Sequence, residues 1–364
     1  MIRVRDIVRV LPLVSFGLVG CTDDPSPWRA GVAAEYSLDE DGYATIYMPP
    51  GGDLRILQLS DVQLSVKASD DEIDETLELV ERLLWEVEPD LVVLPGDLTK
   101  TMEESNWEYL TVIGDLLEAH RKLWMPVFGN HDCQFSWEYG KDYRQLSKHQ
   151  VVKGLREYYP RSLISEGDCE DGVGNYFVNI KDDEGNIIYT LCAFDAVRIA
   201  EHSYFRQRTD AQIEWYTDHI LAISALQYGE DPAQLVPSMV FAHLPLKLCY
   251  DMFQEVEGTD AHFYGVALEG DYSDESWEDS FFEEALALGS TTAMFFGHNH
   301  KNDASFEYDG IRLTWGQLSS YTDYYRSGEE REQYGSTRGG TLITISQHGG
   351  NVGFEVEQVL KSDL

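Results

Sequence analysis

Five short clusters of metal-binding and proton-transferring side chains stand out along this 364-residue sequence. They are Asp61/Gln63, Asp97, Asn130/His131/Asp132, His243 and His298/His300. Carboxylate and amide oxygens combined with imidazole nitrogens form a donor set that suits divalent ions such as Mn, Zn or Fe. A carboxylate that bridges two such ions holds them roughly 3.5–4 Å apart, where they clamp the oxygens of an in-line phosphoryl displacement. The residue types therefore indicate a two-metal hydrolytic site, in which a metal-bound hydroxide replaces a serine or cysteine nucleophile.

Each cluster directly follows a short apolar segment that predicts a buried β-strand. The segments are 54–59, 91–94, 123–128, 239–242 and 292–296. Helices that begin at the capping boxes Ser69-x-x-Glu72 and Ser105-x-x-Glu108 separate the first three segments. Strands that alternate with helices form parallel sheets, and the C-terminal ends of parallel strands meet at one edge. We therefore expect the five clusters to share one site at that edge.

Each cluster also has a simpler explanation when it is considered alone. Asp61 or Asp97 could cap a turn or a helix, and His243 could be a hydrogen-bonded histidine of the core. Five such coincidences, all at the same position relative to a strand, are harder to accept than one shared site.

The remaining segments predict further helices and strands around this site. Residues 142–158 and 280–288 predict helices, and Thr209-x-x-Gln212 begins another that runs to about residue 226. Residues 175–180 and 187–194 predict a hairpin. Short strands follow towards the C-terminus, with a tight turn at Asp309-Gly310, and they are 305–308, 311–315, 341–345 and 352–357.

Together the clusters resemble the motifs of the calcineurin-like metallophosphoesterases, and in particular an exported subgroup similar to purple acid phosphatases. The motifs are Asp61-x-Gln63, Gly96-Asp97, Gly129-Asn130-His131-Asp132, His243-x-Pro245 and Gly297-His298-x-His300. The resemblance covers about residues 54–345. It implies an α/β fold with four α/β/β/α layers, in which two mixed sheets pack face to face and helices flank them. The metal site would lie at the C-terminal strand ends, and residues 51–364 would form one phosphoesterase domain.

The resemblance also implies a role for each candidate ligand of two divalent metal ions, which would be Mn, Zn, Fe or Mg. Asp97 would bridge the two ions. Asp61 and His300 would hold the first ion, with Gln63 at a position where the family commonly has histidine. The second ion would be held by Asn130, His243 and His298.

Three further residues receive roles outside the metal ligands. His131 would contact the substrate phosphate or protonate the leaving group, and Asp132 would orient its ring. Asp303 would be a hydrogen-bond partner behind the ligands. The iron-binding tyrosine of the purple subgroup is expected three residues after the bridging aspartate, where this chain has Lys100, so we do not expect a purple enzyme.

The chain is strongly acidic, with 65 acidic and 27 basic residues and a formal net charge of -38. Such a charge repels polyanions at long range, so we expect no nucleic-acid-binding surface. The expected partner is a phosphorylated small-molecule substrate. A salt-rich habitat or a demand for solubility explains the acidity most simply.

Residues 1–20 have the features of an export signal. Arg3, Arg5 and Arg9 precede the apolar run 10–19, which is too short to span a membrane as a helix. The ending Leu18-Val19-Gly20-Cys21 resembles the lipobox of bacterial lipoproteins, whose cysteine becomes the lipidated first residue. An ordinary signal peptide with a chance cysteine is the alternative. We expect residues 21–50 to be a tether and the protein to be anchored at the bacterial envelope, in the periplasm or at the cell surface, through lipidated Cys21.

The other cysteines leave the disulfide pattern open. Cys192 lies in an apolar, strand-like run, so we expect its thiol to be buried like a small apolar side chain. An exported protein can form disulfides, and Cys133 and Cys169 are the more plausible pair because both lie in polar, turn-rich segments. Cys249 has no clear assignment.

A basic segment precedes the helix that begins at Thr209. Arginine side chains suit phosphate oxygens, so this segment could overhang the metals and bind additional negative charge on the substrate. The segment could equally be a solvent-exposed stretch that leads into the helix and binds nothing. The candidate substrate-binding residues are Arg198, His202, Tyr204, Arg206 and Arg208.

These features favour hydrolysis of phosphate monoesters outside the cytoplasm. The alternatives are a nucleotide or cyclic-nucleotide phosphodiesterase, and a metal-poor protein that only binds phosphorylated ligands. The neutral amide of Gln63 slightly favours the binding protein, whereas the presence of His131 and Asp132 favours catalysis.

Overall fold

The computed structural model describes residues 36–38, 42–49, 52–65, 68–100, 106–133, 146–196, 208–230, 234–270, 280–322, 337–348 and 351–364. The expected signal peptide and Cys21 lie outside these residues, as do four of the five residues of the basic segment. None of the helices in the described part of the chain combines the length and the apolar character needed to cross a bilayer.

The smaller sheet holds the first three predicted strands side by side and in parallel. β3 (Leu54–Gln58), β4 (Leu91–Pro95) and β5 (Leu123–Val127) are connected by α2 (Asp70–Val87) and α3 (Asn106–Ala119). Two antiparallel strands extend the sheet beyond β3, and the chain then ends in a short 3-10 helix; these elements are β13 (Gly339–His348), β14 (Asn351–Leu360) and η2 (Lys361–Asp363). The five-stranded order is β14-β13-β3-β4-β5.

The larger sheet has nine strands in the order β1-β2-β6-β7-β8-β10-β12-β11-β9. Its central strands β7 (Ile187–Phe194), β8 (Ser238–Ala242), β10 (Thr291–Phe296) and β12 (Ile311–Trp315) are parallel. The flanking strands are β1 (Tyr36–Leu38), β2 (Ala44–Tyr47), β6 (Tyr176–Lys181), β9 (His262–Tyr264) and β11 (Ser305–Tyr308). The remaining helices are α4 (Lys148–Tyr158), α5 (Asp210–Tyr228), α6 (Cys249–Val256) and α7 (Phe281–Leu288).

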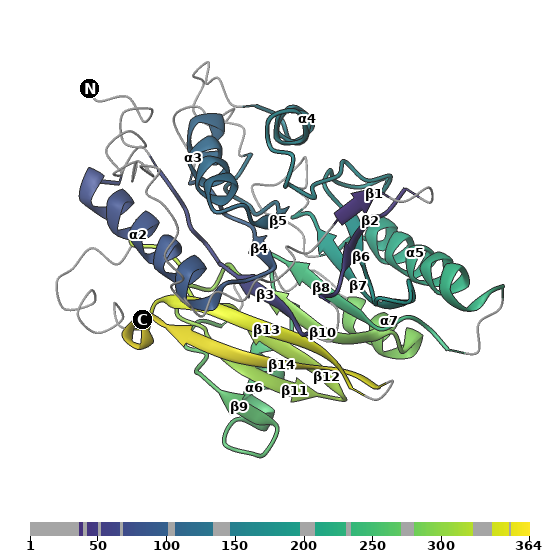
Figure 1. Cartoon of the computed structure of the whole chain (residues 1–364). Coiled ribbons are helices and arrows are strands. Elements are labelled where there is room, and N and C mark those ends of the chain that lie inside the picture. The colour runs from purple at the N-terminus through teal and green to yellow at the C-terminus, as the bar shows by residue number, and fades with distance from the viewer. Residues whose placement is uncertain are drawn as a thin grey trace, which may run out of the picture.

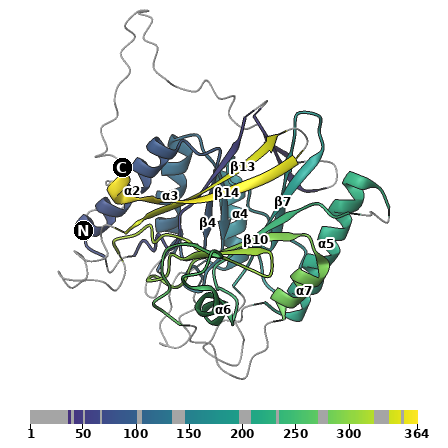
Figure 2. The ribbon, with the colours of Figure 1, turned by 90° about the horizontal axis from the view of Figure 1, so that it is seen from below.

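Alternating side chains of the central strands enter two separate hydrophobic cores. Met239 and Phe241 of β8 pack in the core shared with the smaller sheet, whereas Val240 packs in the core beneath the outer helices. Side chains of a strand point alternately to the two faces, so one sheet can contribute to both cores. Figure 1 and Figure 2 show α2 and α3 on one side of the molecule and α5 and α7 on the other. The predicted arrangement of two mixed sheets flanked by helices is confirmed.

Two helices begin at the capping boxes predicted from the sequence. Ser69 caps α2 together with Glu72, and Thr209 caps α5 together with Gln212. The predicted start of the fourth helix at residue 142 is not tested, because residues 134–145 lie outside the described part. The described helix α4 begins at Lys148, after a capping box formed by Ser147 with Gln150.

Two predictions from the sequence need correction. The tether predicted for residues 21–50 is wrong for residues 36–38 and 44–47, because β1 and β2 extend the larger sheet beyond β6. The disulfide between Cys133 and Cys169 is also wrong: within the described residues the structure contains no disulfide. Cys133 packs against the core between the sheets, whereas Cys169 packs against the core under the outer helices, so the larger sheet separates them.

Candidate metal centre

The candidate ligands lie just beyond the C-terminal ends of five parallel strands, three from one sheet and two from the other. Asp61, Asp97 and Asn130 follow β3, β4 and β5, whereas His243 and His298 follow β8 and β10. Hydrogen bonds join the two groups of strand ends. The His298 amide donates to Asp61 Oδ2 over 3.0 Å, and His243 Nδ1 lies 3.0 Å from the Pro95 carbonyl oxygen. The five clusters thus share one site, as the strand pattern predicted, but the site lies between the strand ends of two sheets and not at one edge of a single parallel sheet.

One group of ligand atoms gathers around Asn130. Its Oδ1 lies 2.8 Å from His243 Nε2 and 3.1 Å from His298 Nδ1. His243 Nε2 is in turn 3.3 Å from Asp97 Oδ2. These four residues are the set that the resemblance assigns to the second ion together with the bridging aspartate.

A second group gathers on the other side of Asp97. His300 Nε2 lies 3.4 Å from Asp61 Oδ1 and 3.0 Å from Gln63 Nε2. Gln63 Nε2 is 3.3 Å from Asp97 Oδ2, the same oxygen that faces His243. Asp97 Oδ2 therefore borders both groups, which is the position that a bridging carboxylate requires.

The arrangement of atoms in this site suits bound cations better than it suits hydrogen bonds between the side chains. The carbonyl of Pro95 only accepts, so His243 donates from Nδ1 and its Nε2 faces Asn130 Oδ1 and Asp97 Oδ2, the direction in which a metal ion held by these residues would lie. In addition, the buried oxygens Asp61 Oδ1 and Gln63 Oε1 accept no hydrogen bond from any described residue. Buried acceptors without donors are costly unless a positive charge lies near them. Ligand atoms of Asp61, Asp97 and His243 lie within 4.8 Å of one another.

The charges around Asp97 favour a cation in the same way. Burial opposes ionisation of Asp97, but His243 and His131 hold the pKa of its carboxyl well below the usual value. Burial also disfavours the charged form of His243, yet Asp97 and Asp61 raise its pKa to about 9. Burial and the neighbouring His243 lower the pKa of His298 to about 3, which keeps that ring neutral, as a metal ligand must be.

Backbone conformation is unusual at these positions. Positive φ angles occur at Asp61 (54°), Gln63 (48°), Asp97 (48°) and His298 (71°), a region that non-glycine residues rarely adopt. Such conformations cost on the order of 1–3 kcal/mol each and concentrate at functional sites. The strained turns that carry the ligands therefore lower the stability of the fold. This is expected where the exact positions of the ligands matter for function.

Three glycines permit the close approach of the ligand loops. A Cβ on Gly129 would lie 2.2 Å from Asp97 Oδ1, one on Gly96 would lie 2.6 Å from the His243 Cβ, and one on Gly297 would lie 2.7 Å from Asp61 Oδ2. Each glycine immediately precedes a candidate ligand, so its lack of a side chain sets the distance between the two groups of ligands.

We expect Gly129→Ala to lower kcat/KM by about 10²-fold, because displacement of a reacting group by about 1 Å has an effect of this size. The new methyl group would push Asp97 away from its place between the two ligand groups. Gly353→Ala is the matched control, since a Cβ there meets no atom within 4 Å. Steady-state kinetics and metal content of both variants provide the test, and unchanged kinetics in Gly129→Ala would contradict the packing argument.

His131 lies at the opening of this site, next to Asp97. Its backbone amide donates to Asp97 Oδ1 over 2.8 Å, and its ring Nε2 is 3.9 Å from Asp97 Oδ2. The side chain retains 18% exposure, whereas that of His243 is fully buried. A ring that borders both the metal ligands and the solvent is placed to meet a substrate.

Asp132 holds the backbone of this site. Its carboxylate accepts from the Gly129 amide over 2.8 Å and from the Thr99 amide over 3.0 Å, so it ties the turn after β5 to the turn after β4. Burial and the charge of Asp97 raise the pKa of Asp132 to about 7, while the two amide hydrogen bonds oppose this shift. These hydrogen bonds give Asp132 a further role in fixing the ligand turns, and its role in orienting the His131 ring stays a prediction.

The structure shows hydrogen-bond partners of two other candidate residues. The carboxylate of Asp303 accepts from the Val266 amide and from Gln317 Nε2, and its role behind the metal ligands stays a prediction. Arg208 is 6% exposed and donates to the carbonyls of Leu244 and Pro245. These contacts brace the segment after His243, and a role of Arg208 in substrate binding stays a prediction. Arg198, His202, Tyr204 and Arg206 lie outside the described residues.

The contacts that hold His243 and Gln63 from behind could not be predicted from the residues alone. The Pro95 carbonyl accepts from His243, and the Thr322 hydroxyl donates to the Gln63 carbonyl. Backbone acceptors are present at every residue, so nothing in the sequence marks the one that orients a ligand.

Comparisons with known proteins agree with this geometry. A family model described as calcineurin-like phosphoesterase matches residues 54–302. A protein of Arabidopsis thaliana named probable inactive purple acid phosphatase 29 is 24% identical over 318 residues, which cover 77% of this chain and 75% of that protein. Probable inactive purple acid phosphatase 14 of the same plant is 23% identical over 275 residues, covering 70% of this chain and 65% of the relative. Among solved structures, a dimetal phosphatase from Danio rerio superposes with a TM-score of 0.51 at 11% identity, covering 85% of this chain and 99% of that one.

Proposed function

The chain belongs to the calcineurin-like phosphoesterase family, and from this we propose that it is a phosphomonoesterase that uses two divalent metal ions outside the cytoplasm. The observation that carries the proposal is the position of Asp97 Oδ2, which lies 3.3 Å from His243 Nε2 and 3.3 Å from Gln63 Nε2. One carboxylate oxygen thus lies between residues of both ligand groups, as a two-metal clamp on a phosphoryl group needs. On the second side it accepts from the amide nitrogen of Gln63, which would hold an ion through its Oε1.

When bound, the two ions would activate a water molecule and polarise the phosphoryl oxygens. Asn130, His243 and His298 would hold one ion and Asp61, Gln63 and His300 the other, on either side of Asp97. His131 would donate a hydrogen bond to a phosphate oxygen or a proton to the leaving group. Asp132 would keep these groups in register through the amides of the two turns.

The names of the plant relatives raise the alternative of an inactive protein that binds phosphorylated ligands. This chain carries every candidate ligand that the family pattern requires, except that Gln63 stands in place of histidine. His131 is present, and its side chain is partly exposed to solvent at the site. These features support hydrolysis over simple binding.

The substitution at Gln63 leads to a prediction about metal affinity. An amide oxygen is a harder and weaker donor to Zn or Fe than imidazole, so the first ion should be lost on purification and restored by Mn or Mg. Gln63→His should tighten this site and shift its preference towards Zn or Fe. Calorimetric titration of metal-free protein measures both sites. Two tight equivalents in the wild type, with no gain in Gln63→His, would contradict the prediction.

Substrate class is tested by comparing p-nitrophenyl phosphate with bis-p-nitrophenyl phosphate, with Mn, Zn, Fe and Mg added one at a time. The proposal expects metal-dependent hydrolysis with a higher kcat/KM for the monoester. A preference for the bis ester would favour the phosphodiesterase, which includes nucleotide and cyclic-nucleotide substrates. Binding of phosphate without turnover under any metal would favour the inactive binding protein.

The location outside the cytoplasm rests on residues 1–21, which lie outside the described residues. Incorporation of labelled palmitate in a bacterial host tests lipidation of Cys21, and Cys21→Ser is the control. The proposal expects label and membrane association in the wild type, and neither in the variant. Membrane association that survives Cys21→Ser would indicate another anchor.

A further inference from the structure

A buried polar loop lies behind the turn that carries Asp61 and Gln63. Residues 317–322 follow β12 of the larger sheet and bond to the first residue of β13 in the smaller sheet, where the Ser319 hydroxyl donates to the Gly339 carbonyl over 2.7 Å. Connecting segments usually run over the surface, yet Ser319 and Thr322 are at most 3% exposed. The polar groups of a buried loop need partners inside the protein, so these partners show what the loop supports.

The loop bonds to both ends of the ligand turn. The Ser319 amide donates to the Ser60 carbonyl over 2.9 Å, and the Thr322 hydroxyl donates to the Gln63 carbonyl over 2.5 Å. From the other direction, the Gln63 amide donates to the Asp97 carbonyl over 2.9 Å. Both backbone groups of Gln63 are thus held while the residue adopts a φ of 48°, which non-glycine residues rarely adopt.

The hydrogen bonds around Thr322 have a single possible direction. The Gln63 carbonyl only accepts, so the one hydrogen of the Thr322 hydroxyl is used there. Ser320 Oγ lies 2.9 Å from Thr322 Oγ1 and accepts from the Thr322 amide over 3.0 Å. Ser320 must therefore donate to Thr322. The chain from Ser320 through Thr322 to Gln63 fixes the Thr322 hydroxyl towards the carbonyl that it holds.

The side chain of Gln63 depends on this backbone for its position. Its Nε2 lies 3.3 Å from Asp97 Oδ2 and 3.0 Å from His300 Nε2, but its buried Oε1 accepts no hydrogen bond from any described residue. No donor therefore holds the oxygen that would bind the first ion, and the backbone has to direct it. The side-chain hydrogen bonds of Thr322 within the described residues go to Ser320 and Gln63, and neither is a candidate ligand of the second ion.

We propose that Thr322 is a positioning residue for the first metal ion and sets the affinity of this ion separately from that of the second. The inference rests on the proposed two-metal function. Without the hydroxyl, the buried carbonyl of Gln63 loses its donor, and the residue relaxes from its left-handed conformation and moves its side chain away from the ion. Contacts behind metal ligands typically change metal affinity by about 10–100-fold.

Titration of the metal-free full chain with Mn²⁺, followed by the electron paramagnetic resonance signal of the free ion, measures the affinity of each site. Thr322→Val replaces the hydroxyl by a methyl group, Thr322→Ala removes it without a replacement, and Thr322→Ser keeps it. Gln63→Ala identifies which dissociation constant belongs to the first ion. The two variants without a hydroxyl keep the comparison independent of the folding of either one.

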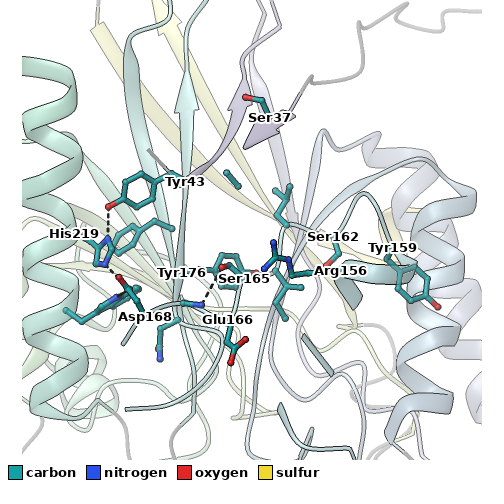
Figure 3. Close-up of a pocket in the computed structure, with 18 of the residues that line it drawn as sticks. Ser37, Tyr43, Arg156, Tyr159, Ser162, Ser165, Glu166, Asp168, Tyr176 and His219 are labelled. Atoms are coloured by element: carbon teal, nitrogen blue, oxygen red, sulfur yellow. Dashed lines mark hydrogen bonds and ion pairs between the residues drawn. The ribbon is translucent and has the colours of Figure 1, made fainter. Parts of the chain in front are cut away.

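Tyr176→Phe is the matched control. It also removes a buried hydroxyl that donates to a backbone carbonyl, in this case that of Pro126 over 2.7 Å. Tyr176 lies among the residues that line a cavity of about 730 Å³, and none of the described lining residues is a candidate metal ligand (Figure 3). A loss that only reflects weaker packing should therefore appear in this variant as well.

We expect Thr322→Val and Thr322→Ala to raise the Kd of the first ion by about 10–100-fold and to leave that of the second ion unchanged. Thr322→Ser should restore the wild-type values, and Tyr176→Phe should lower Tm without a change in either Kd. The combined variant Gln63→Ala/Thr322→Val should bind the first ion as Gln63→Ala does, because Thr322 acts through Gln63.

Three results would overturn the inference alone, in a wild type that binds two ions. These are an unchanged first Kd in both variants without the hydroxyl, equal losses at the two sites, and a further loss of the first ion when Thr322→Val is added to Gln63→Ala. A wild type that binds no second ion at any Mn²⁺ concentration would instead overturn the proposed two-metal function, and the inference with it.

Discussion

Asp97→Asn is expected to abolish phosphatase activity and dinuclear metal binding together. The substitution removes the negative charge that faces both groups of ligand atoms, while Asn130, His243 and His298 remain in place. Loss of this charge should cost several kcal/mol of metal binding and transition-state stabilisation, roughly 10³-fold or more in kcat. Metal content by elemental analysis and turnover of p-nitrophenyl phosphate measure the two effects.

The fold should survive this change. Asparagine tolerates the left-handed conformation that Asp97 adopts at φ 48°, and the side-chain oxygen can still accept from the His131 amide. Asp303→Asn is the matched control, because that carboxylate lies after the same strand as His298 yet bonds to Val266 and Gln317. Full activity in Asp97→Asn, or equal losses in the two variants, would refute the bridging role.

His131→Ala is expected to lower kcat by about 10²–10⁴-fold, the usual contribution of a general acid, while metal content stays close to that of the wild type. The ring is partly exposed at the site, and the hydrogen bond from His131 to Asp97 comes from the backbone amide, which alanine keeps. We therefore expect the turns that carry the metal ligands to keep their positions in the variant. Loss of the metals from His131→Ala would show that the ring is a ligand.

The two candidate roles of His131 make different predictions about the leaving group. A proton donor matters most for a poor leaving group, so the loss should be larger with phenyl phosphate or an alkyl phosphate than with p-nitrophenyl phosphate. A residue that only contacts the phosphate should cause equal losses with all three substrates. The comparison decides between the two roles on one variant.

Tertiary structure determines the hydrogen-bond partners of Asp132, Asp303 and Arg208. Each of them bonds to backbone amides or carbonyls from distant segments, and a backbone group carries no signature in the sequence. The roles expected for Asp132 and Asp303 came from the family resemblance and that of Arg208 from its basic segment, so these contacts could not be predicted. Similarly, β1 and β2 are short strands that form only because the edge of β6 is available to pair with them.

The strand ends and their polar clusters could be predicted from the residues alone, because apolar periodicity and capping boxes are local properties of the chain. These local patterns also predicted that ligands such as Asp61, Asn130 and His298 share one site. How the ligands meet there depends on tertiary packing. The two sheets approach each other closely because glycines such as Gly129 leave room for Asp97. This close approach determines which oxygen atoms face both groups of metal ligands. Packing between distant segments sets these distances, and no local pattern of residues encodes them.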